Sequence, residues 1–152
     1  MFTAPDPDRQ RWLTLFARAP AGILERFWQA YLNRHSAPRW SRIRGPEPGL
    51  VMLRGRVGGD GQPFNLGEMT VTRCTIRLAD GTVGHGYVPG IEETGAEIAA
   101  VLDGLLHDPI GRGAIEQEIL EPLEHAEAER ATAEARRAAA TKVEFFTLVR
   151  GA

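Results

Sequence analysis

The sequence predicts an α+β protein, in which a small antiparallel β-meander is flanked by N-terminal helices and a long C-terminal helical region. Apolar residues recur at helical spacing within residues 9–33 and again within 95–140, whereas within residues 50–90 they alternate with a period of two. The 152 residues, 43% hydrophobic and 25% charged, suit one sizeable core. We therefore expect a single domain over residues 1–152.

The N-terminal segment, residues 9–33, predicts two short helices. Asp8 can cap the first, which carries Trp12, and Pro20 interrupts the chain before the second begins. The second helix should bury one face, because its large apolar side chains share that face. These side chains are Ile23, Leu24, Phe27, Trp28, Tyr31 and Leu32. Residues 34–49 are rich in proline and basic side chains and predict an irregular connection.

Three strands are predicted within residues 50–90, in the segments "LVMLRGRV", "MTVTRCTIRL" and "TVGHGYV". Between the last two, Asp80 and Gly81 favour a two-residue hairpin turn, because both central positions can take positive φ. Such a turn places Ile76 opposite His85, and the register of the whole hairpin follows from it.

This register predicts two different faces for the sheet. The apolar face carries Cys74, Ile76, Leu78, Val83, His85 and Tyr87, joined by Val51 and Leu53. The other face is basic, with glycines opposite its arginines, and carries Arg54, Arg56, Arg73 and Arg77. Four guanidinium groups on one face repel one another unless they meet anions. The anion can be a ligand phosphate, acids of a partner subunit, or the glutamates of the C-terminal helices.

The last third of the chain predicts helices over residues 95–140. Apolar stripes run through "IAAVLDGLL" and from Ile115 to Leu123, and Pro122 should kink or restart the second helix. Residues 126–140 are rich in alanine and predict a solvated helix, since they offer almost no large side chain to bury. The end, residues 142–150, predicts a further strand or an extended arm.

Composition excludes several classes of protein. The formal net charge of -2 provides no general positive field for nucleic acid or an anionic membrane. The N-terminus "MFTAPDPDRQRW" has acids and prolines where a secretory signal has an apolar core, so a cytoplasmic protein is expected. One cysteine and four scattered histidines predict no metal site and no cofactor bound by this chain alone.

The hairpin segment "GQPFNLGEMTVTRC" combines residue types that are common in active sites. The neighbouring "GGDGQPFNLGE" lacks the P-loop pattern and is not followed by a helix, which favours a flexible hairpin loop over a phosphate cradle. Cys74 can be a nucleophile beside His85 or a small buried hydrophobe. His85 lies between two glycines, so it is either a catalytic residue or a core or interface histidine.

Specific strings then suggest a family. Residues 49–90, "GLVMLRGRVGGDGQPFNLGEMTVTRCTIRLADGTVGHGYVPG", and the terminal "AATKVEFFTLVRG" resemble PhnG, the G subunit of the bacterial carbon-phosphorus lyase system. The resemblance extends from Arg9 to Gly151. After "HGYV" the family leads us to expect a basic segment, where this chain has the acidic "PGIEETGAE".

The resemblance implies a cytoplasmic subunit of a core complex with the H, I and J subunits, assisted by the ATP-binding K and L subunits, and a homodimer within that complex. It implies that the complex uses MgATP as a substrate and that the phosphonate displaces adenine from ribose C1, giving a ribose 1-phosphonate 5-triphosphate. No catalytic residue of the G subunit is carried over from the family.

Two functions are therefore in competition. The first is a non-catalytic subunit that shapes or supports the coupling of phosphonate to ATP. The second is a catalytic subunit in which Arg73, Arg77 and His85 hold the triphosphate or the phosphonate. The candidates for contact with substrate or partner are Arg54, Arg56, Asn65, Glu68, Arg73, Arg77 and His85.

Overall fold

The computed structural model describes residues 6–141 and confirms the α+β class. Its elements are α1 (Pro7–Arg18), α2 (Ile23–Leu32), β1 (Trp40–Arg56), β2 (Pro63–Leu78), β3 (Val83–Pro89), α3 (Glu93–Leu106), α4 (Arg112–Ile115), the π-helical turn η1 (Glu116–Leu120) and α5 (Glu121–Ala140). The strands form one antiparallel sheet in the order β1-β2-β3, which is the predicted meander. The strand or arm predicted at residues 142–150 lies outside the described residues.

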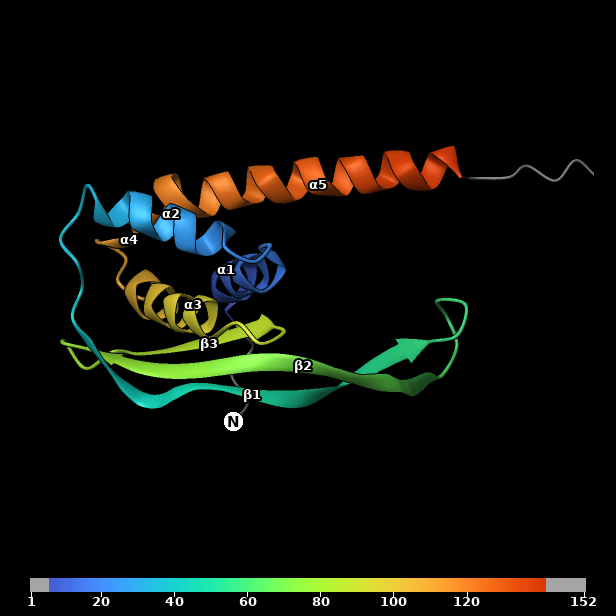
Figure 1. Cartoon of the computed structure of the whole chain (residues 1–152), viewed down its shortest axis with the longest axis horizontal. Helices are drawn as coiled ribbons and strands as arrows, with labels where there is room; N and C mark the ends of the chain where they lie inside the picture. The colour runs from blue at the N-terminus through green and yellow to red at the C-terminus, as the bar shows by residue number, and fades with distance from the viewer. Residues whose placement is uncertain (1–5, 142–152) are drawn as a thin grey trace, which may run out of the picture.

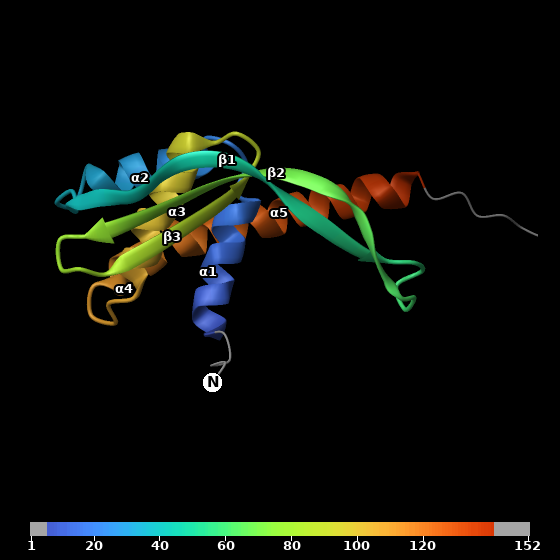
Figure 2. The ribbon, with the colours of Figure 1, turned by 90° about the horizontal axis from the view of Figure 1, so that it is seen from below.

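The helices are gathered on one face of the sheet (Figure 1). Helix α3 packs directly on the strands, and α1 and α2 bring aromatic side chains into the same core. Trp12, Phe16, Trp28, Ile76 and Leu102 are all buried there. Seen from the other side, the sheet has no described helix in front of it (Figure 2). One face of the sheet therefore belongs to the core and the opposite face, here called the outer face, is open.

The N-terminal helices form as predicted, with a different cap. The carboxylate of Asp6, not that of Asp8, accepts a hydrogen bond from the backbone N–H of Asp8 at 3.0 Å. Pro7 then occupies the first turn, where no N–H is needed. In α2 the predicted apolar face is turned inward, with Leu24 and Trp28 buried.

Strand β1 is much longer than predicted, because it begins at Trp40 and takes in most of the segment expected to be an irregular connection. Pro46 and Pro48 are compatible with it since β1 is an edge strand, where a missing N–H can face away from the sheet. Register shifts flank Arg44 and absorb the irregularity. Trp40 is anchored by its indole N–H, which donates to a carboxylate oxygen of Glu97 at 3.0 Å.

The predicted register between β2 and β3 is wrong by one residue. Leu78 pairs with Thr82 across a loop of three residues, in which Gly81 takes a φ of 93°. A three-residue loop that ends in a left-handed glycine is a standard alternative to the two-residue turn. Ile76 consequently lies opposite Gly84, and His85 lies opposite Thr75.

The shift exchanges the two sides of β3. Gly84 and Gly86 lie beneath α3, where an added Cβ would stand 2.0 Å from the carbonyl oxygens of Ala100 and Ala96 respectively. These glycines allow α3 to lie directly against the strand. His85 and Tyr87, predicted on the apolar face, instead point to the outer face, and the predicted glycine floor under the arginines does not exist.

The C-terminal helices follow the predicted pattern. Ile119 and Leu123 are buried, and Pro122 stands in the first turn of α5, directly after η1. Since Pro122 cannot donate to the carbonyl four residues earlier, a local π-helical turn accommodates the break. From residue 129 to 141 every side chain is exposed, as expected of a solvated helix.

Candidate subunit interface

The outer face of the sheet brings together three of the predicted site residues. Arg73 lies opposite Tyr87, and Arg77 lies opposite Val83 on the neighbouring strand. Between them, His85 lies opposite Thr75, whose Oγ1 is 3.3 Å from the imidazole Nδ1. Arg73, Arg77 and His85 therefore share one open surface.

The single face of four arginines predicted from the sequence is wrong. Val51 pairs with Met69 on β2. Met69 and Arg73 are an even number of positions apart, so both side chains, and that of Val51, point to the outer face. Arg54 and Arg56 have the opposite parity to Val51 on β1, so they point to the helix side of the sheet. They also lie far along the hairpin, since seven residues of β1 separate Arg54 from the partner of Arg73, about 23 Å.

Arg73 has a counter-charge within the same sheet. Its guanidinium donates to a carboxylate oxygen of Glu47 at 2.7 Å, and Arg44 approaches the same oxygen at 3.4 Å. The acid therefore comes from β1, and not from the C-terminal helices that the sequence suggested as a source. Arg77 differs, because within residues 6–141 it makes no ion pair.

The distal half of the β1–β2 hairpin projects beyond the helices and is here called the hairpin arm, residues 49–56 and 63–70 (Figure 1). Several of its apolar side chains are uncovered. Leu50 is 65% exposed, Met52 58%, Leu66 64% and Phe64 42%. The predicted contact residues Asn65 and Glu68 also lie on the hairpin arm and are exposed.

Both faces of the hairpin arm carry apolar side chains. Leu50 and Met52 alternate onto the helix side, whereas Phe64 and Leu66 lie over the backbone of Gly55, 3.7 and 3.9 Å from the position of its missing Cβ. A two-stranded ribbon is at best marginally stable in water when nothing packs on it. Uncovered apolar surface of this kind marks an interaction site.

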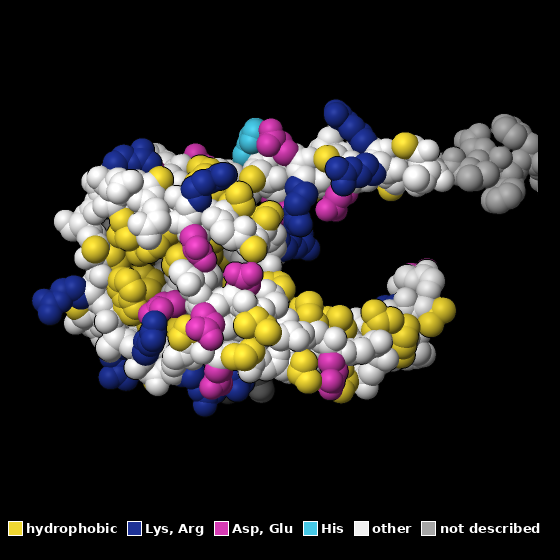
Figure 3. Space-filling view, viewed as in Figure 1, with side chains coloured by type: hydrophobic (Ala, Val, Ile, Leu, Met, Phe, Trp, Pro, Cys, Tyr) yellow, Lys and Arg dark blue, Asp and Glu magenta, His cyan; other side chains and the backbone are white. Residues whose placement is uncertain are grey.

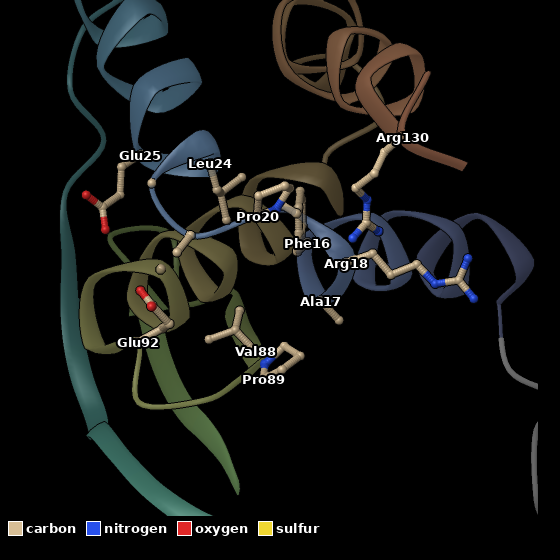
Figure 4. A pocket seen from close by; sticks show the side chains of 14 residues that line it. Phe16, Ala17, Arg18, Pro20, Leu24, Glu25, Val88, Pro89, Glu92 and Arg130 are labelled. Carbon is tan, nitrogen blue, oxygen red and sulfur yellow. The ribbon is translucent and has the colours of Figure 1, made fainter. Parts of the chain in front are cut away.

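Helix α5 and the hairpin arm project from the same side of the molecule, and the space-filling view shows a deep open hollow between them (Figure 3). At the root of this region the α1–α2 turn, the end of β3 and α5 enclose a cavity of about 390 Å³. Figure 4 shows Phe16, Leu24 and Val88 lining it. This cavity could not be predicted from the sequence, because its walls come from the five elements α1, α2, β3, α3 and α5.

The charges around the cavity are divided by sign. Arg18 and Arg130 stand on one side, and Glu25 and Glu92 on the other (Figure 4). Arg130 is also hydrogen-bonded to Glu127, so α5 carries its own ion pair at this point. An apolar cavity with opposite charges at its two sides suits a side chain of a partner protein better than an anion.

Cys74 is a buried thiol, which agrees with its interpretation as a small buried hydrophobe rather than a nucleophile. It is 1% exposed, and its Sγ lies 3.4 Å from the carbonyl oxygen of Arg44. Burial is the main cause that raises the pKa of the thiol, and the nearby carboxylate of Glu97 adds to the effect. His85 points to the opposite face, so the two residues do not form a nucleophile and base.

A buried carboxylate that the sequence analysis missed joins three elements. Asp103 of α3 is fully buried and accepts hydrogen bonds from Arg9 at 3.0 and 2.9 Å, from the indole of Trp12 at 2.9 Å and from the backbone N–H of His85 at 2.9 Å. Burial alone would raise the pKa of Asp103, but these hydrogen bonds outweigh it and hold the pKa below the usual 3.8. One acid within an apolar helical stripe is the sequence signal that points to such a site.

The described residues show neither a metal-binding cluster nor a membrane-spanning helix. No three His, Cys, Asp or Glu side chains within residues 6–141 gather as the ligands of a metal would. None of the helices in the same range combines the length and the apolar character that a bilayer-spanning segment needs.

These features define a class of protein: a small α+β protein with one covered and one open sheet face and an uncovered apolar arm. Residues 7–151 match the family model described as "Phosphonate metabolism protein PhnG". The chain is 44% identical over 148 residues to the curated "Alpha-D-ribose 1-methylphosphonate 5-triphosphate synthase subunit PhnG" of Rhizobium meliloti (strain 1021), a match that covers 95% of this chain and 90% of that protein. The chain belongs to the PhnG family.

Proposed function

We propose that this chain is a subunit of an alpha-D-ribose 1-methylphosphonate 5-triphosphate synthase, to which it contributes docking surface rather than the reacting groups. The name of the curated relative and the 44% identity over almost the whole chain support the assignment to this synthase. The observation that carries the docking role is the hairpin arm, whose apolar side chains have no cover within this chain.

Neighbouring subunits supply that cover in our proposal. The hairpin arm and α5 hold an element of a partner between them, and an apolar side chain of the partner enters the cavity lined by Phe16 and Leu24. In line with the family resemblance, the partners are the H, I and J subunits, with the K and L subunits as ATP-binding accessories. The complex contains two copies of this chain and works in the cytoplasm.

The reaction proposed for the assembly is the transfer of a phosphonate to ribose. A phosphonate oxygen forms a bond to ribose C1 of MgATP, the bond from C1 to adenine breaks, and the triphosphate stays on the ribose. Cys74 and His85 lie on opposite faces of the sheet, so the thiol has no imidazole base beside it, which supports placing the chemistry on other subunits.

The test is co-purification of tagged chain with the other subunits. A Met52→Glu/Leu66→Glu variant places two charges on the hairpin arm, where both side chains are already exposed, so the isolated chain should fold as before. We expect the variant to lose at least nine tenths of the co-purified partners, because charge at the centre of an apolar interface is strongly unfavourable.

The matched control is Ile110→Glu, since Ile110 is 93% exposed and lies between α3 and α4, away from the hairpin arm. This control should assemble normally. Equal recovery of partners with the arm variant and with wild type would refute the docking role of the arm.

A catalytic role for Arg73, Arg77 and His85 is the second candidate, and one observation favours it: the register places all three on one open face. The assembled complex separates the two proposals. If an Arg73→Ala subunit assembles but the complex loses turnover by more than about a hundredfold, this face takes part in the reaction. Unchanged turnover favours the docking role alone.

A further inference from the structure

The open sheet face ends in a small basic hollow next to the β2–β3 loop. It has a volume of about 370 Å³ and is lined by Arg39, Trp40, Ser41, Arg77, Leu78 and Ala79. Of these residues, only Arg77 is a contact candidate predicted from the sequence.

The strand register explains why these residues meet. Ser41 pairs with Arg77, and the ladder continues one step further, where the backbone N–H of Ala79 donates to the carbonyl oxygen of Arg39 at 3.0 Å. Alternation along both strands therefore turns Arg39, Ser41, Arg77 and Ala79 to the outer face. Arg39 and Arg77 are diagonal neighbours, within reach of long side chains, and the methyl group of Ala79 leaves space between them.

The two guanidinium groups lack internal counter-charges. Neither Arg39 nor Arg77 forms an ion pair with any residue of the part of the chain that the structure describes. The acid nearest in sequence is Asp80, and its Oδ1 accepts the backbone N–H of Thr82 at 2.9 Å. By contrast, Arg73 on the same face is already held by Glu47.

We propose that this hollow binds a tetrahedral oxyanion of the phosphate or phosphonate class. Each of the two guanidinium groups can donate a pair of hydrogen bonds, and the Ser41 hydroxyl can donate one more. A tetrahedral group presents oxygens in several directions and can meet donors from both strands at once, whereas a carboxylate presents its oxygens in one plane. The proposal deepens the catalytic candidate above, because it moves the anion contact from Arg73 to Arg39 and Arg77.

The experiment uses the full chain by itself and inorganic tripolyphosphate as the probe. Calorimetric titration measures the Kd of wild type, of Arg39→Ala/Arg77→Ala and of Arg26→Ala/Arg137→Ala. The third protein is the matched control, since it loses the same two charges from exposed positions on α2 and α5. We expect saturable binding to wild type and to the control, and a Kd at least about tenfold weaker for Arg39→Ala/Arg77→Ala. Thermal unfolding of each variant confirms that the fold is retained.

Three outcomes overturn the proposal. The first is no saturable binding to wild type at millimolar tripolyphosphate, and the second is an equal loss of affinity in both variants, which indicates general electrostatic attraction. The third is that Arg39→Ala/Arg77→Ala binds tripolyphosphate as wild type does but no longer joins the assembly, in which case the natural occupant is an acidic side chain of a partner. The titration needs no partner, so its failure leaves the proposed subunit role standing.

Discussion

At the scale of single residues, the buried carboxylate of Asp103 joins α1, α3 and β3. It is fully buried, yet it remains an acceptor for Arg9 and Trp12 of α1 and for the backbone of β3. Replacing this carboxylate is costly to stability, because the donors that remain stay desolvated and lose the acceptor of their hydrogen bonds.

We predict that Asp103→Asn lowers the free energy of unfolding by about 2 to 4 kcal/mol, somewhat below the full value for a sealed ion pair because Arg9 is 34% exposed. Urea unfolding at pH 7 measures the loss. Asp60→Asn, at an exposed loop position, is the control and should change stability very little.

The same variant tests the direction of the pKa shift. Because folding lowers the pKa of Asp103 below 3.8, its contribution is complete above that value and is lost as the pH falls through the folded pKa. The stability difference between wild type and Asp103→Asn should therefore shrink below about pH 4. A difference that stays constant down to pH 2 would mean that folding does not lower the pKa of Asp103.

Residue roles could be predicted from the sequence only where the residue type decides the environment. Cys74 was recognised as a possible buried hydrophobe because a thiol is small and apolar. The environment of His85 could not be predicted, because it depends on whether a loop has two or three residues. The pairing of Arg73 with Glu47 depends on a strand that the prolines concealed.

At the scale of elements, the β2–β3 loop decides which side chains enter the core. Asp80-Gly81 is compatible with a two-residue turn and with a three-residue loop ending in a left-handed glycine. Packing selects the second, because it places Gly84 and Gly86 against α3 and keeps His85 and Tyr87 outside. Turn sequence alone does not contain that choice.

The close approach of α3 yields a prediction about these glycines. An added Cβ at position 84 would stand 2.0 Å from a backbone oxygen, so α3 has to move away in Gly84→Ala. We expect a loss of about 1 to 3 kcal/mol in urea unfolding. Gly49→Ala on β1 is the matched control, since nothing lies within 4 Å of its added Cβ, and it should be neutral or slightly stabilising. Equal effects of the two substitutions would contradict the packing observed.

Strand β1 shows a second limit of prediction from sequence. Pro46 and Pro48 normally argue against a strand, so the sequence predicts an irregular connection there. An edge strand accepts them, and β1 is at the edge for its whole length. Edge position is a property of the complete sheet, so the extent of β1 could not be deduced from its own residues.

At the scale of the whole molecule, helical and alternating periodicities were sufficient for the class, the meander and the order of the elements. They could not reveal the cavity at the root of α5 or the separation of the arginines, because both depend on how distant segments pack. The sequence predicts that the hairpin arm is a hairpin, but not that it extends beyond the helices. The alternation of side chains along the strands is the same whether or not another element covers the ribbon.

A thermal measurement tests the proposed cover. Partner subunits that bind only the folded chain at about 100 times their Kd add roughly 2.7 kcal/mol of stability. For a chain of this size we expect the Tm to rise by about 5 to 10 °C. Met52→Glu/Leu66→Glu should show no rise under the same conditions. If the arm variant is stabilised as much as wild type, its partners bind elsewhere.

The hairpin arm is also exposed to aggregation during the interval between folding and assembly. Between the end of folding and the arrival of partners, a ribbon with free backbone edges and bare apolar side chains can pair with other ribbons and begin to aggregate. A shorter interval means that less of the chain aggregates. Synthesis of this chain at the same time as its partner subunits therefore protects it better than any change to its own core.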